Sequence, residues 1–302
     1  MMTRDSFVMR IFSLLVLLTA GTMLTYFLFY IIIALETGFN TEQINVITQN
    51  LTTSPKYIRI LQLLQGCCIF ILPSILYCKI FHISITGTLS LNKPRGRDLL
   101  MSALSIIFII PFLNVLVEWN EQITMPAFLS EVEQWMRTKE DQAAKVTELL
   151  LSGTKMSDLI QNLIVVAAMA AIGEELFFRG LLTSALHGNR PHTKTPHLLI
   201  WAVAFLFSAV HLQFYGFIPR LLLGAWFGYL LWWSGSIFVP MLAHFTNNAI
   251  STLAIFSTNK GLIKTDIDSV GMDQTWWMCI PSILFFMIVV GYFTKREKDA
   301  SD

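Results

Sequence analysis

Three short motifs place ionisable or amide side chains inside segments that are otherwise almost free of charge. In chain order these residues are Glu174, Glu175 and Arg179, then Phe207 and His211, then His244 and Asn248. A charged side chain at the centre of a bilayer costs about 2.5 to 3.5 kcal/mol on insertion scales, so each one calls for a partner or a chemical task. The three motifs are therefore the first candidates for a functional site.

The first motif contains one acid with a partner on its own helix and one without. Glu175 precedes Arg179 by four residues, so the two side chains share a helix face and can form an ion pair. Glu174 points about 100° away from that face. It must meet a partner from another segment or hold its proton, and such a carboxyl suits general-base catalysis. We expect Glu175 and Arg179 to shape the site and Glu174 to act in it.

The other two motifs each align two side chains at i, i+4 spacing, Phe207 with His211 and His244 with Asn248. If the three helix faces converge, a carboxyl, two imidazoles and a carboxamide share one cavity and could hydrolyse an acyl bond. Glu174 would take a proton from water, and His211 would hold or shuttle it. His244 and Asn248 would donate hydrogen bonds to the developing oxyanion. Phe207 is expected to be a packing wall.

The same residues also allow an alternative in which a metal ion activates the water. Glu174, His211 and His244 could bind Zn²⁺ and leave one position for water. The chain has no H-E-x-x-H pairing, and asparagine is a poor zinc ligand. These observations favour direct activation of water by Glu174, with no certain cofactor and with zinc as the alternative.

The composition of the chain requires lipid around these motifs. Of 302 residues, 54% are hydrophobic and only 14% are charged, whereas soluble domains have about 25% charged residues. The mean hydropathy of +0.60 excludes a disordered or collagen-like chain. A net charge of +1 provides no basic field for a nucleic-acid backbone. We therefore expect an integral membrane protein whose partners are the bilayer and a peptide or protein substrate, not nucleic acid.

Stretches without Asp, Glu, Lys or Arg locate the spanning elements, because crossing about 30 Å of hydrocarbon takes roughly 20 apolar residues of helix. They predict an all-α bundle of about eight transmembrane helices. The stretches are 11–35, 60–78, 99–117, 159–189 apart from its motif, 198–219, two within 221–259, and 274–294. Ser234-Gly235-Ser236 divides the double-length run. Without repeats or linkers, residues 1–302 form a single polytopic domain, with the motifs in 159–256.

Basic residues at the ends of these stretches predict the orientation. Those placed on one side are Arg4, Arg10, Lys79, Lys93, Arg95, Arg97, Arg190, Lys194, Lys295, Arg296 and Lys298. By the positive-inside rule this side, with both termini, is cytoplasmic. The first apolar stretch is longer than a signal-peptide core and no A-x-A site follows, so we interpret it as a retained anchor.

One sizeable polar stretch, 118–158, falls on the predicted outer side. The spacing of Phe128, Val132, Trp135 and Met136 indicates an amphipathic helix. We expect this helix to lie at the outer membrane surface.

In this order, the three motifs resemble those of the CPBP intramembrane endopeptidases, the CAAX-processing and bacteriocin-processing family also called Abi. The resemblance covers residues 159–256 and implies an eight-helix membrane protease that cleaves a membrane-associated or lipid-linked protein or peptide. The residues it assigns to the site are Glu174, His211, His244 and Asn248, with Glu175 and Arg179 in support. The family is commonly described as metalloendopeptidases, although its site is also argued to work without metal. Nothing in the chain indicates whether the substrate is prenylated.

Two other functions remain open from the sequence. A non-catalytic scaffold or immunity protein would use the same polar groups to bind a partner peptide or to hold the helices together. An ion or proton transporter would use the intramembrane carboxylates as a path. The transporter is less favoured, because the intramembrane ionisable groups all lie in the second half of the chain and no inverted halves are evident.

Overall fold

The computed structural model describes residues 7–50, 54–187, 197–263 and 269–301. Within these ranges, every regular element is a helix and there is no strand. The predicted all-α membrane class is therefore confirmed. Arg4, Arg190 and Lys194, on which the orientation partly depends, lie outside the described residues. The side of the membrane that each terminus faces stays a prediction.

Long helices make up most of the described chain. The elements of its first half are α1 (Phe7–Glu36), α2 (Thr41–Gln49), α3 (Pro55–Gln65), η2 (Gly66–Ile71), α4 (Leu72–Ile80), α5 (Ile85–Thr88), α6 (Gly96–Glu121), η3 (Ala127–Leu129) and α7 (Ser130–Leu151). Those of its second half are α8 (Met156–Asn162), η4 (Leu163–Met169), α9 (Ala170–Glu175), η5 (Leu176–Leu182), α10 (Thr183–His187), α11 (His197–Ala209), α12 (Phe217–Ser234), α13 (Phe238–Asn259), η7 (Asp273–Met278) and α14 (Cys279–Ser301). The segments η2, η4 and η5 are π-helical turns within longer helices.

Five of the described helices are long and apolar enough to cross a membrane. They are Phe7–Glu36, Pro55–Ile80, Gly96–Glu121, Met156–Leu186 and Asp273–Arg296, and each overlaps a predicted span. The other three predicted spans correspond to α11, α12 and α13. Helix α11 has 13 residues, roughly 20 Å at 1.5 Å per residue, which is too short to cross the hydrocarbon alone. The total of about eight crossings stays a prediction.

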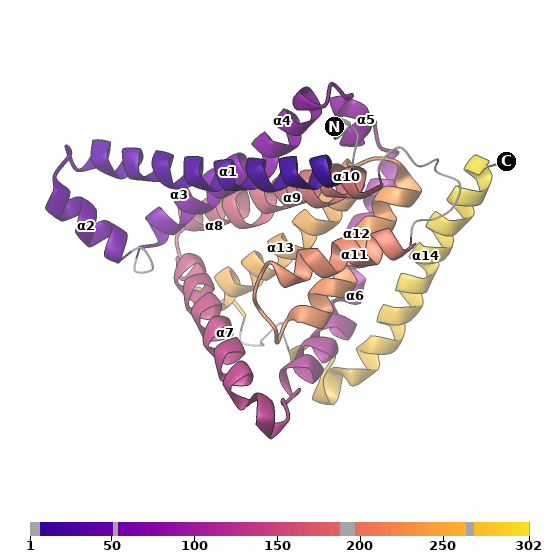
Figure 1. Ribbon diagram of the computed structural model, residues 1–302. Helices are drawn as coiled ribbons and strands as arrows, with labels where there is room; N and C mark the ends of the chain where they lie inside the picture. The colour runs from indigo at the N-terminus through magenta and orange to yellow at the C-terminus, as the bar shows by residue number, and fades with distance from the viewer. Residues whose placement is uncertain (1–6, 51–53, 188–196, 264–268, 302) are drawn as a thin grey trace.

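The helices form two groups that meet at the three motifs. In Figure 1, α1, α3 and α4 run beside α8 to α10, and direct packing joins α1 to α3, η2 and α10. In the second group, α6 packs on α12, α13 and α14, while α11 packs on α12. Helix α13 links the groups, because it packs on both η4 and α9. The motif on α9 therefore faces the motif on α13.

The break in the double-length apolar run is a helix stop. Gly235 follows the end of α12 with a φ of 67°, and its N–H donates to the carbonyl of Leu231 at 2.8 Å. This left-handed conformation favours glycine at a helix C-terminus. Helix α13 begins three residues later at Phe238. The predicted division of this run into two helices is confirmed.

The amphipathic helix predicted in the polar stretch is α7. Leu150 and Leu151 at its end are buried, whereas Val132 and Trp135 near its start are 45% and 46% exposed. It lies along the side of the molecule (Figure 1), where it packs on α3, α8 and α13. Its contact with the outer membrane surface stays a prediction.

Candidate active site

Glu174 and Glu175 of the first motif lie at the end of α9, which follows the π-helical segment η4, and Arg179 lies in the next π-helical segment, η5. Such turns are frequent at functional sites and disturb the regular backbone hydrogen-bond ladder. Helix α9 also approaches η2 closely at Gly173. A Cβ added to Gly173 would lie 3.3 Å from the carbonyl oxygen of Gly66 and 3.3 Å from the Cβ of Phe70. Small residues here let α9 pack tightly on η2, as the run of alanines before the motif predicts.

Glu175, Arg179 and His244 form a buried hydrogen-bonded cluster. Oε1 of Glu175 accepts from a terminal guanidinium nitrogen of Arg179 at 2.9 Å and from Nδ1 of His244 at 2.9 Å. The exposed fractions of the three side chains are 0%, 1% and 6%, respectively. Because a carboxylate only accepts hydrogen bonds, Nδ1 of His244 carries the hydrogen and Nε2 is directed away from Glu175.

Arg179 also connects the motif helix to the second group of helices. Its other terminal nitrogen donates to the carbonyl of Gly224 on α12 at 2.9 Å. Its guanidinium lies 4.4 Å from the ring centre of Phe207 and 5.3 Å from that of Phe227. Cation–π contacts of this kind are stronger where water is excluded. The guanidinium therefore joins η5 to α11 and α12 at the centre of the molecule.

Glu174 faces the free side of the His244 ring. Its Oε2 lies 3.9 Å from Nε2 of His244, and its side chain is 16% exposed. Phe227 stacks on the same imidazole at a centroid distance of 5.1 Å and an interplanar angle of 16°. His244 is thus held by Glu175 at one nitrogen and by an aromatic face, with its other nitrogen directed toward Glu174. The two acids of the first motif meet one histidine of the third.

His211 is not on a helix face as the i, i+4 spacing predicts. Helix α11 ends at Ala209, and His211 lies in the turn that follows it. Its Nδ1 donates to the carbonyl of Phe207 at 2.7 Å, an acceptor that the ending helix leaves without its regular partner. This bond puts the hydrogen on Nδ1 and leaves the lone pair of a neutral ring on Nε2. The prediction of one helix over 198–219 is wrong after Ala209, because the chain turns there before α12 begins at Phe217.

Asn248 bonds to the motif helix rather than standing free beside His244. Its Nδ2 donates to the carbonyl of Val166 in η4 at 3.0 Å, and its Oδ1 accepts from Nδ2 of Asn247 at 3.1 Å. A carboxamide nitrogen has two N–H groups, so one remains for another acceptor. A backbone carbonyl of the π-helical segment η4 therefore holds the side-chain amide of Asn248 on α13.

The ring of Phe207 lies at the meeting point of the three motifs. Its centre is 5.1 Å from that of His211 and 5.9 Å from that of His244, in addition to its contact with Arg179. The packing role expected for Phe207 fits this geometry. The two imidazoles therefore share Phe207 as a neighbour.

The sequence reasoning did not identify Phe227 or Arg220. Phe227 lies in an apolar run, where nothing distinguishes it from other core aromatics. Arg220 interacts electrostatically with Glu174 and with His211. Its signal was present, because it is the one charged residue between the fifth and sixth apolar stretches. Arg220 lies in the first turn of α12.

The described side chains do not fit the zinc alternative. Among them, no group of three or more His, Cys, Asp or Glu is arranged to hold a metal ion. Nδ1 of His244 is bonded to Glu175 and Nδ1 of His211 to a carbonyl, which leaves Nε2 of each ring for any further partner. We derive no step of the chemistry through a metal ion.

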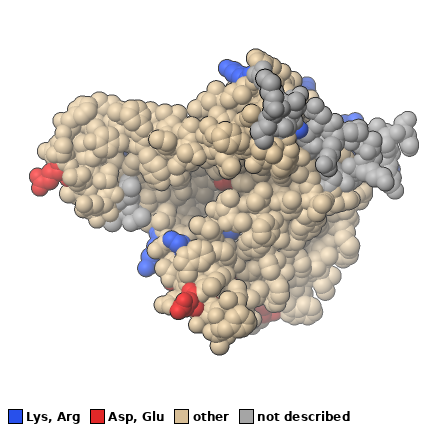
Figure 2. All heavy atoms as spheres, in the orientation of Figure 1, with Lys and Arg blue, Asp and Glu red and all other residues tan. Residues whose placement is uncertain are grey.

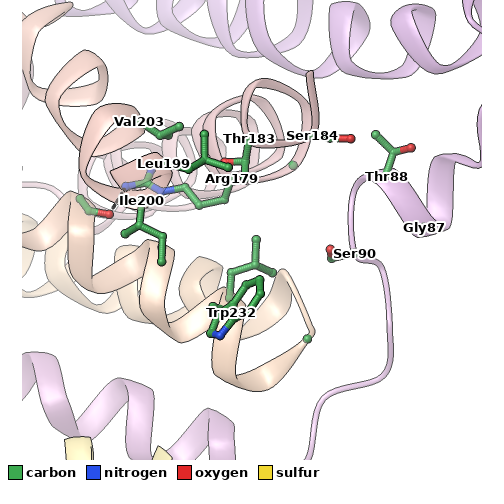
Figure 3. A pocket seen from close by; sticks show the side chains of 15 residues that line it. Gly87, Thr88, Ser90, Arg179, Thr183, Ser184, Leu199, Ile200, Val203 and Trp232 are labelled. Carbon is green, nitrogen blue, oxygen red and sulfur yellow. Dashed lines mark hydrogen bonds between the residues drawn. The ribbon is translucent and has the colours of Figure 1, made fainter. Parts of the chain in front are cut away.

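Open space borders this cluster at Arg179. A cavity of about 420 Å³ borders Arg179, and Thr88 and Ser90 lie across it from the guanidinium-bearing helix (Figure 3). Apolar side chains such as Ile200 and Val203 complete its wall. Figure 2 shows a hollow below the layer of α1 and α8 to α10, with acidic atoms visible inside it. The cavity beside Arg179 has room for part of a substrate chain.

Comparison with known proteins identifies the segment that carries the site. Residues 156–250 match the family described as type II CAAX prenyl endopeptidase Rce1-like. The chain contains an Rce1-like segment. All three motifs lie within it, so the resemblance to CAAX-processing endopeptidases is confirmed over this part of the chain. No solved structure matches the chain.

One curated relative also matches the chain. YpbD of Bacillus subtilis (strain 168), described as an uncharacterized protein, is 28% identical over 95 residues. The match covers 30% of this chain and 44% of YpbD, less than half of that relative's length.

Proposed function

We propose that this protein is an intramembrane endopeptidase in which Glu174 activates water for attack on a peptide bond. The observation that carries the proposal is the relay from the buried Arg179–Glu175 pair through Nδ1 of His244 to its Nε2, 3.9 Å from Glu174. A histidine oriented by a buried carboxylate at one nitrogen and directed toward a second reacting group at the other is a recurring arrangement in hydrolases. The Rce1-like segment supports a protease of the CAAX type in general.

In the first step, the carboxylate of Glu174 takes a proton from water while the water oxygen bonds to the scissile carbonyl carbon. The carbonyl π electrons move to its oxygen, which becomes an oxyanion. The remaining N–H of Asn248 is the donor for this oxyanion. When Nε2 of His244 carries a proton, the ring donates as well, and Glu175 balances its charge.

In the second step, the oxyanion collapses and the carbon–nitrogen bond breaks. The leaving nitrogen takes the proton held by Glu174, so the products are a carboxyl group and an amine, and one water is consumed. Nε2 of His211 can hold this proton in transit, because its Nδ1 is occupied by the Phe207 carbonyl. Arg220 interacts with both Glu174 and His211, so its positive charge stabilises the Glu174 carboxylate and favours release of the proton from His211 to the leaving nitrogen.

The substrate class follows from where the site lies. The first motif sits within one of the apolar helices long enough to cross a membrane. A soluble protein would have to bring its peptide into that layer. We therefore propose a membrane-embedded or lipid-linked peptide or protein as the substrate, cleaved within reach of the hollow in Figure 2.

Replacing Glu174 by glutamine tests the proposal. The substitution is nearly isosteric but removes the base, so kcat for cleavage of a membrane-anchored reporter peptide in liposomes should fall by about 100-fold or more. Glu148→Gln, on an exposed carboxylate of α7, is the matched control and should cleave at the wild-type rate. Mass spectrometry of the reporter gives both the rate and the cleaved bond.

The same pair of variants separates catalysis from a scaffold function. A scaffold that only binds a partner peptide would function equally well with Glu174→Gln, since glutamine preserves the shape and the hydrogen-bonding capacity. Undiminished cleavage by Glu174→Gln would refute the water-activation mechanism. Membrane proteomics of cells with wild-type protein and with this variant would then identify natural substrates.

A further inference from the structure

The turn that carries His211 is held in place by side chains from other elements. It runs from the end of α11 at Ala209 to the start of α12 at Phe217. The side chain of Asn120, at the end of α6, donates to the carbonyl of Phe214 at 3.0 Å and accepts from the N–H of Ile218 at 3.1 Å. Non-helical backbone inside a membrane protein requires such partners.

Helix α7 supplies a second set of contacts to the same turn. Oε2 of Glu140 accepts from the backbone N–H of Tyr215 at 3.1 Å. The guanidinium of Arg137 lies 4.5 Å from the ring centre of Tyr215, and the ring of Trp135 lies 5.3 Å from that of Phe214. Three residues of one helix therefore contact two consecutive residues of the turn.

The contacts of α7 are themselves fixed from its first turn. Arg137 donates to Glu133 at 2.8 Å and 3.1 Å, and Glu133 also accepts from the N–H of Met125 at 3.2 Å. The hydrogen bond from Arg137 lowers the pKa of the Glu133 carboxyl, so it stays ionised at neutral pH. The guanidinium is thereby kept over the Tyr215 ring.

Arg220 carries the connection onward to the candidate active site. It donates to the side-chain oxygen of Gln213 at 2.8 Å and to the Gln213 carbonyl at 3.3 Å, so it also holds the turn. The same guanidinium interacts electrostatically with Glu140 and with Glu174. A displacement of Glu140 would therefore alter the backbone near His211 and the charge around Arg220.

We propose that α7 is an external brace for the catalytic turn and that Glu140 is its main positioning residue. The inference rests on the proposed protease function, because it gives the braced turn its task. Glu140 touches no reacting atom. It accepts from the N–H of Tyr215, four residues after His211, and so holds the backbone of the turn. Its charge also attracts Arg220, which bonds to Gln213 in the same turn. A helix expected at the membrane surface thereby becomes part of the machinery that places His211.

Hydrogen–deuterium exchange of the full-length protein in detergent micelles tests the brace without requiring activity. Glu140→Ala removes the acceptor for the Tyr215 N–H, so exchange in segment 210–218 should become about tenfold faster. Glu140→Gln retains an acceptor oxygen and should restore slow exchange. Glu148→Ala, two turns further along α7 and exposed, is the control and should leave this segment unchanged. Equal exchange in Glu140→Ala and wild type, or fast exchange in Glu140→Gln, would overturn the brace.

Steady-state cleavage of the reporter peptide by the same variants tests the positioning role. Glu140→Ala should lower kcat about tenfold with KM nearly unchanged, and Glu140→Gln should recover most of kcat. Faster exchange with an unchanged kcat would refute the positioning of His211. No cleavage by the wild-type protein would refute the proposed protease instead, while the exchange data would still decide whether α7 braces the turn.

Discussion

Replacing Arg179 by methionine perturbs the centre of the candidate site most directly. Methionine keeps much of the side-chain volume but removes the ion pair with Glu175 and the hydrogen bond to the Gly224 carbonyl, both at 2.9 Å. It also removes the cation–π contacts with two aromatic rings. The carboxylate of Glu175, whose side chain is 0% exposed, then keeps only the hydrogen bond from His244.

The size of the effect follows from the burial of both partners. Breaking a buried ion pair by removing one partner costs about 3–5 kcal/mol, because the other charge is left uncompensated. We expect this decrease in the free energy of unfolding for Arg179→Met and a similar one for Glu175→Gln. The double variant carries neither charge. Its destabilisation should therefore be smaller than the sum of the two single effects by about 3 kcal/mol.

Reversible unfolding in mixed detergent micelles, followed by circular dichroism, measures the four free energies of this cycle. The comparison isolates the coupling between the two side chains from the loss of packing that each substitution also causes. Additive effects, within about 0.5 kcal/mol, would refute the reasoning. So would a cost below about 1 kcal/mol for Arg179→Met, which is what an exposed pair contributes.

Four further outcomes are expected. Phe227→Ala should lower the free energy of unfolding by about 3–5 kcal/mol and also slow cleavage, because its buried ring stacks on His244; stability and kcat check this together. Gly228→Ala should destabilise by about 1–3 kcal/mol in the same unfolding assay, since the added Cβ would lie 2.8 Å from Cγ2 of Ile200. Dialysis against a chelator should leave cleavage unchanged, and activity restored by added Zn²⁺ would contradict this. The hydrogen bond from Arg137 lowers the pKa of the Glu133 carboxyl. The contribution of ionised Glu133 to the free energy of unfolding is therefore complete above about pH 4.3 and is lost as the pH falls through the lowered pKa. The free energies of unfolding of wild type and Glu133→Gln should differ at pH 7 and converge in acid.

The positions of the helices were largely predictable from the chain. Lipid cannot satisfy backbone hydrogen bonds, so an uncharged stretch of sufficient length has to be helical. The stop at Gly235 was also readable, since three small residues interrupt an apolar run and glycine accepts a left-handed conformation. The end of α11 at Ala209 was not, because no Asp, Glu, Lys or Arg interrupts the run from Leu198 to Pro219. Only the contacts with Asn120 and Glu140 show why the backbone can turn there.

The pairing of the site residues was predictable in part. Spacing placed Glu175 beside Arg179, and the ion pair has that geometry. Spacing could not tell which imidazole meets the first motif, and we had assigned His211 to the proton of Glu174. The structure places His244 against both acids and leaves His211 beside Phe207.

By itself, the sequence determined the membrane-helical class, the three motifs and the amphipathic character of α7, because each depends on composition or on the angle between side chains along one helix axis. Only the tertiary structure decided which motifs touch, that Glu175 orients His244, and that a surface helix holds the turn beside His211. Those facts depend on how the helices are rotated and translated relative to one another. The residues of a single segment do not encode this arrangement. They arise from the packing of all segments at once.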